Sequence, residues 1–73
     1  MDALAVGILE ELDALRYFLE EAHRRAGSLA RNDEHIAKEF GRSAHSQLTG
    51  LIRILSQTEE VLRELAEVGS AQN

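Results

Sequence analysis

The chain has 73 residues, a net charge of −5 and no cysteine, so it is at most one domain and has neither disulfides nor thiolate zinc sites. A domain of this size is marginally stable alone, and oligomerisation or a partner protein is therefore the support that we expect. The negative charge excludes a basic surface for nucleic acid that extends over the whole chain. No apolar run reaches the ~20 residues of a membrane span.

The N-terminal stretch MDALAVGILEELDAL is acidic where a secretory signal peptide would be basic, and it leads directly into a helical pattern. We therefore expect nothing to be cleaved from the chain and no membrane partner. The lack of cysteine agrees with a cytoplasmic location, where disulfides are rare.

The composition favours helices throughout, since proline is absent and alanine, leucine, glutamate and arginine are abundant. Apolar residues recur at steps of three and four, which predicts a first helix over about 2–30 with Asp2 as its N-cap. With Leu12 at heptad position a, the a and d positions are Ala5, Ile8, Leu12, Leu15, Leu19, Ala22, Ala26 and Leu29.

The sequence RNDEH interrupts this pattern and predicts a turn at about 31–33. Asn32 can end the first helix in a left-handed conformation, and Asp33 can cap the next helix. The second helix is predicted over about 34–68, followed by a frayed tail at 69–73. An antiparallel hairpin folded about residue 32 would bring Ala22 to Gly41, where small residues allow close approach, and Ile8 to Leu55.

The second helix is apolar at a, d, e and g, which is typical of a helix that contacts two neighbours. Val61, Leu62 and Leu65 also fall beside or beyond the expected start of the first helix. We therefore expect an all-α protein, a two-helix antiparallel hairpin that completes a four-helix bundle by dimerisation or by docking on a helical partner. The predicted partner-binding residues are Leu51, Ile54, Leu55, Val61, Leu62 and Leu65, with Glu59, Glu60 and Glu64 setting orientation at the edge.

Charge is distributed unevenly along the chain. Residues 23–45 around the turn carry about +2, and the remainder carries −7. Pairs such as Glu21–Arg25 and Glu59–Arg63 have the favourable i,i+4 order. The acids near the end of the second helix oppose its dipole, which leaves either a solvated face or a site for a basic partner. Whether Arg24, Arg25 and Arg31 bind an anion stays open, but nucleic acid is disfavoured because exposed aromatics are lacking there.

Catalysis and metal binding have little support in the sequence. Glu20–His23 and His35–Glu39 have spacings found in metal-binding bundles, which keeps such a bundle as an alternative function. However, Glu20 at b and His23 at e are expected to face away from the bundle axis. The Ser and His of SAHS, at 43–46, lack an orienting acid and a pocket. We therefore predict no catalytic residue, no metal and no cofactor.

Two segments resemble a known class of protein, namely LAR at 29–31 and LTGLIRILSQ at 48–57. With the length and the two-helix plan, they are similar to the small helical-hairpin co-chaperones that keep type III secretion needle subunits soluble. HSQLTGL at 45–51 is equally similar to helical antiactivators that sequester quorum-sensing regulators. Both resemblances imply that the chain masks apolar surface on a partner. The positions that carry the first likeness are Leu29, Ala30, Arg31, Leu48, Gly50, Ile52, Ile54, Leu55, Ser56 and Gln57.

The predicted function is therefore protein binding without catalysis, of the adaptor, co-chaperone or antiactivator type. The expected partner is a second copy of the chain, a different helical protein, or both. A purely structural homo-oligomer, or a small phage or plasmid factor, is the main alternative.

Overall fold

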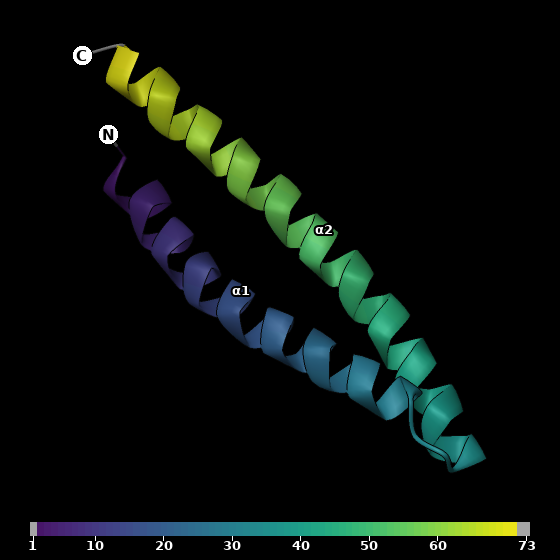
Figure 1. Ribbon diagram of the computed structural model, residues 1–73. Helices are drawn as coiled ribbons and strands as arrows, with labels where there is room; N and C mark the ends of the chain where they lie inside the picture. The colour runs from purple at the N-terminus through teal and green to yellow at the C-terminus, as the bar shows by residue number, and fades with distance from the viewer. Residues whose placement is uncertain (1, 72–73) are drawn as a thin grey trace.

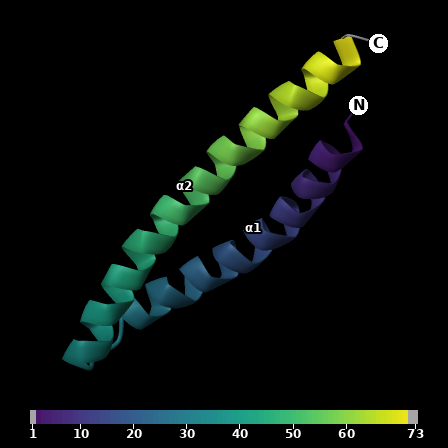
Figure 2. The same cartoon turned by 180° about the vertical axis from the view of Figure 1, so that it is seen from behind.

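The computed structural model describes residues 2–71, and within them the chain forms two α-helices and no strand. Helix α1 spans Ala3–Ala30 and helix α2 spans His35–Ala71. They run antiparallel along a rod of 58 × 15 × 11 Å, with both termini at the same end (Figures 1 and 2). The prediction of an all-α helical hairpin is confirmed.

Helix α1 begins and ends through local hydrogen bonds. The Asp2 carboxylate accepts from the backbone N–H groups of Leu4 at 2.8 Å and Ala5 at 3.2 Å, which confirms Asp2 as the N-cap. At the other end, the N–H of Asn32 donates to the carbonyl of Leu29 at 3.0 Å. Among the described residues no backbone φ is positive, so the prediction of a left-handed Asn32 is wrong.

Helix α2 is capped by Glu34 and not by Asp33. The Glu34 carboxylate accepts from the N–H groups of Ile36 at 3.2 Å and Ala37 at 3.1 Å, while the Asn32 side chain accepts from the Glu34 N–H at 2.9 Å. The Asn32 turn takes up one more residue of the linker, which moves the cap along the chain. Helix α2 then continues to Ala71, beyond the predicted end at 68. Residues 72–73 of the predicted tail lie outside the described part.

The pairing of the two helices differs from the expected one by about one heptad. Gly41 packs against the backbone of Ala30, with the carbonyl carbon of Leu29 only 2.6 Å from where a Cβ would lie. Its packing role is thus confirmed, but Ala22 is not the partner. Facing positions, such as Arg16 and Ser56, have residue numbers that add up to about 72.

The shift arises because α2 begins beyond the end of α1, so α1 meets only the second turn of α2 and later residues (Figure 1). One expectation is corrected as a result, since Ile8 does not face Leu55. Of the two places expected for residues 61–65, beside or beyond the start of the first helix, the structure shows the first. The surplus length of α2 is divided between the turn end and the open end of the rod (Figure 1).

The helices meet through their a and e positions and not through a and d. The buried residues all lie at a or e positions: Ala5, Ala26, Gly41, Leu55, Glu59 and Ala66. At Gly41 the lack of a side chain lets the two backbones approach closely. The consequence is that the d and g positions of both helices are turned toward one open side of the hairpin.

Candidate protein-binding face

Most of the exposed large apolar side chains share one side of the rod. Among the described residues, eleven of the thirteen fall at d or g positions of the two heptads, with Tyr17 and Ile36 as the exceptions. We call these eleven the d/g face: Leu4, Ile8, Leu15, Phe18, Leu29, Phe40, Leu51, Ile54, Val61, Leu65 and Val68. Because large exposed apolar patches are a common feature of interaction surfaces, we take the d/g face as the candidate site.

A groove runs between the two helices at the middle of this face. Six of its seven lining residues are leucine or isoleucine, and the seventh is a threonine. The lining residues are Leu12, Leu15, Leu19, Leu51, Ile54, Leu55 and Thr58. Both helices contribute d positions to the groove, which shows that their d edges lie on the same side. Such a groove is suited to receive the apolar side chains of another helix.

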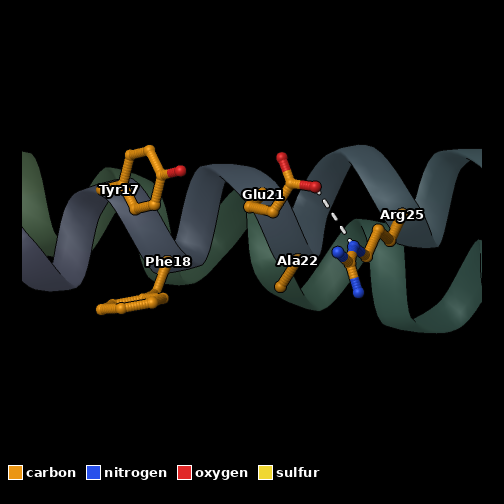
Figure 3. Close-up of a pocket in the computed structure, with 5 residues that line it drawn as sticks. All are labelled: Tyr17, Phe18, Glu21, Ala22 and Arg25. Carbon is orange, nitrogen blue, oxygen red and sulfur yellow. Dashed lines mark hydrogen bonds and ion pairs between the residues drawn. The ribbon is translucent and has the colours of Figure 1, made fainter.

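The α1 edge of the face carries an exposed aromatic residue. Phe18 is 67% exposed and stacks edge-to-face with Tyr17 at 5.5 Å between ring centroids. Phe18 and Ala22 point to the same side, whereas Tyr17 and Glu21 point away from it (Figure 3). Arg25 closes this shallow hollow, and its Nε donates to Glu21 at 3.1 Å.

Glu21 is the centre of a small ion-pair cluster. Its carboxylate accepts from Arg24 at 2.5 and 3.2 Å and from Arg25 at 3.1 Å. These hydrogen bonds, first that from Arg24 and then that from Arg25, lower the pKa of Glu21 to about 2. The same contact raises the pKa of Arg24 above its ordinary value. The predicted Glu21–Arg25 pair is confirmed, and it fixes the stem of Arg25 beside the d/g face.

A second ion pair lies inside the seam between the helices. Arg16 donates to both Ser56, at 2.8 Å, and Glu59, and Glu59 is only 3% exposed. The hydrogen bond with Glu59 raises the pKa of Arg16. Arg63 approaches Glu59 from the same helix at 4.0 Å, as predicted. Glu59 is therefore already paired within its own chain, and its role in orienting a partner stays a prediction.

The other predicted partner-binding residues divide into three groups. Leu55 is buried at the floor of the groove, and Leu62 is half-buried against α1. Leu51, Ile54, Val61 and Leu65 are exposed and belong to the d/g face, whereas Glu60 and Glu64 are exposed but outside it.

The α1 half of the face was missing from the sequence-based set. Its members are Leu4, Ile8, Leu15, Phe18 and Leu29. The heptad pattern assigns them to d and g positions. They were not predicted as partner-binding because d residues were assumed to pack against the other helix of the hairpin.

The acids at the open end are less unusual than the sequence suggested. Because α2 ends at Ala71, Glu59 and Glu60 lie about three turns from its last residue. The helix dipole acts mainly within the last turn, so only Glu67 opposes it directly. This removes much of the reason to expect a dedicated site for a basic partner there.

The histidines also occupy unexpected positions. His23 faces α2 and not away from it: its ring stacks on His45 at 4.0 Å, and its Nε2 lies 2.9 Å from the Thr49 hydroxyl. The e position turns inward because the seam uses a and e. Within residues 2–71, no group of three or more histidine or carboxylate side chains is arranged to hold a metal ion.

Comparisons with known proteins add no relative: no protein-family description, no curated protein and no solved structure matches this chain. Neither described helix is long and apolar enough to cross a membrane.

Proposed function

We propose that this chain is a non-catalytic interaction module that covers apolar helical surface on a partner polypeptide through its d/g face. The observation that carries the proposal is the concentration of exposed large apolar side chains on that one side of the rod. Leaving them in water costs about 25 cal/mol for each Å² of apolar surface. Covering them with a partner is therefore favourable.

The shape of the face supports a helical partner. The groove lies parallel to two antiparallel helices, and its exposed d and g residues, such as Leu51 and Ile54, recur at the spacing that a third helix can match. A flat or extended partner would leave the groove unfilled. Adaptor, co-chaperone and antiactivator activities, including those of the type III secretion co-chaperones, all fit this mode of binding, and we propose the cytoplasm as the compartment.

The experiment that tests this function is site-specific photo-crosslinking in cells. A photoreactive amino acid would replace Ile54 or Val61 on the face, and Arg53 or Gln57 on the outer surface of α2 as matched controls. We expect crosslinks to a polypeptide from the two positions on the face and none from the controls. Equal crosslinking at all four positions, or none at any of them, would contradict the proposal.

A further inference from the structure

The hairpin exposes more surface than a compact protein of its mass. Its accessible surface is 5509 Å², whereas a compact monomer of this mass exposes about 4,500 Å². The excess, about 1,000 Å², is close to the ~800 Å² that each partner buries in a standard interface. One further partner of similar size would bury an area of this magnitude.

The charges on the face suggest what that partner is. Of all the d and g positions in the two helices, only Glu11 and Arg25 are charged, and they have opposite signs. Both are g positions of α1, seven residues before and seven residues after Phe18. A twofold axis through Phe18 would place a second α1 antiparallel to the first. Glu11 of each copy would then meet Arg25 of the other, so that one axis forms two ion pairs.

The conformation of Arg25 is compatible with this contact. Among the side chains that the structure describes, residues 2–68, Arg25 is bonded only through its Nε, to Glu21. Its terminal nitrogens, which can hold a carboxylate bidentately, are left for an acceptor from outside the chain.

The same axis also suits α2. Facing positions in the hairpin have residue numbers that add up to about 72, so Phe18 lies opposite Ile54 at the middle of the rod. An antiparallel pairing of α2 about Ile54 sets Phe40 against Val68 of the second copy and Gln47 against its Val61. No like charges meet, because the d and g positions of α2 carry none.

The overall charge favours the same orientation. On either side of the midpoint at Phe18 and Ile54, the turn half of the hairpin, residues 19–53, carries +1 and the other half carries −6. With the turns at opposite ends, each turn half lies beside a half of −6. With the turns at the same end, the two halves of −6 would lie side by side and repel. We propose that a second copy of this chain covers the d/g face, forming a twofold four-helix bundle with the hairpin turns at opposite ends. This inference rests on the proposed function and names its partner.

The first test is a charge-reversal series with the full chain, followed by analytical ultracentrifugation across a wide dilution range. Wild type is expected to be a dimer. Glu11→Arg sets like charges together twice in the dimer and is expected to raise the dissociation constant at least about tenfold. The double variant Glu11→Arg with Arg25→Glu restores opposite signs and is expected to recover the dimer. Glu10→Arg, on the outer surface, is the matched control and should leave dimerisation unchanged.

The second test is disulfide formation, which is clean because the chain has no cysteine. Ile54→Cys is expected to form a disulfide with itself across the axis. A mixture of Phe18→Cys and Ile54→Cys chains forming the mixed product instead would show that the turns lie at the same end, and would overturn the inference.

A wild type that is monomeric at all concentrations, or trimeric, would also overturn the inference. So would a double variant that dimerises as weakly as Glu11→Arg. If the wild type is monomeric but Ile54 crosslinks to a different protein in cells, the proposed function stands and only the second copy is ruled out. If neither position on the face crosslinks to any polypeptide, both fail.

Discussion

Gly41 of α2 packs directly on the backbone of Ala30 in α1, and this contact sets the pairing of the two helices. A Cβ at position 41 would lie 2.6 Å from the carbonyl carbon of Leu29, and backbone atoms cannot move aside as a flexible side chain can. The position therefore requires glycine for steric reasons, although its backbone conformation is an ordinary helical one.

Gly41→Ala is expected to lower the free energy of unfolding by about 1–3 kcal/mol, because overpacking forces the helices apart at the turn end. The matched control is Gly50→Ala, in the same helix, where nothing lies within 4 Å of an added Cβ. That change should raise stability by about 1 kcal/mol through helix propensity. Urea denaturation followed by circular dichroism measures both, and equal effects of the two variants would contradict the close contact.

Removing Arg16 is expected to destabilise the hairpin more than removing an exposed arginine, because it leaves the buried Glu59 carboxylate without its main partner. Arg16→Met should therefore lower the melting temperature more than Arg53→Met does. Adding Glu59→Leu to the Arg16→Met chain should recover most of the loss, since an apolar pair can replace a buried ion pair. Additive losses in the double variant would show that Glu59 does not depend on Arg16.

The Glu21 cluster is expected to make stability depend on acid pH. The folded pKa of Glu21 is about 2, below its ordinary value of 4.5. Because the folded value is the lower one, the stabilisation is fully present above pH 4.5 and is lost as the pH falls toward 2. The difference in stability between wild type and Glu21→Gln should shrink over this range, and salt should reduce it because the cluster is exposed. A difference that does not change between these two values would refute the assignment.

The start of α2 offers a test between two adjacent acids. Glu34→Ala is expected to cost about 1 kcal/mol, because it removes the acceptor for the N–H groups of Ile36 and Ala37. Asp33→Ala should stay within about 0.5 kcal/mol, as surface substitutions usually do. Chemical denaturation measures both losses of stability. A larger loss for Asp33→Ala than for Glu34→Ala would show that Asp33 is the cap.

The helices and the first cap could be predicted because they depend on local sequence. Apolar periodicity and the Asp2 side chain act over a few residues, and they define α1 without reference to the rest of the fold. The choice between Asp33 and Glu34 depended on the conformation of the linker, which one sequence does not determine.

The pairing and the rotation of the helices could not be predicted in the same way. Moving α2 by a heptad keeps every a position at an a position, so the hydrophobic pattern alone does not distinguish the alternatives. The rotation that brings the e positions into the seam depends on small residues such as Ala66 and on the Arg16–Glu59 pair. These contacts join residues far apart in the sequence. That rotation moved Glu59 and His23 inward and turned Phe18 outward, which changed the candidate face more than it changed the fold.

The close contact at Gly41 has a mechanical consequence. It holds the helices together at the turn end, whereas the start of α1 and the end of α2 are joined by no turn and this half of the rod carries most of the negative charge. Separation of the helices should begin at this open end, where the acids repel, and progress toward Gly41. Amide hydrogen exchange should accordingly slow from Ala5 to Ala26, and added salt should slow it most at the open end.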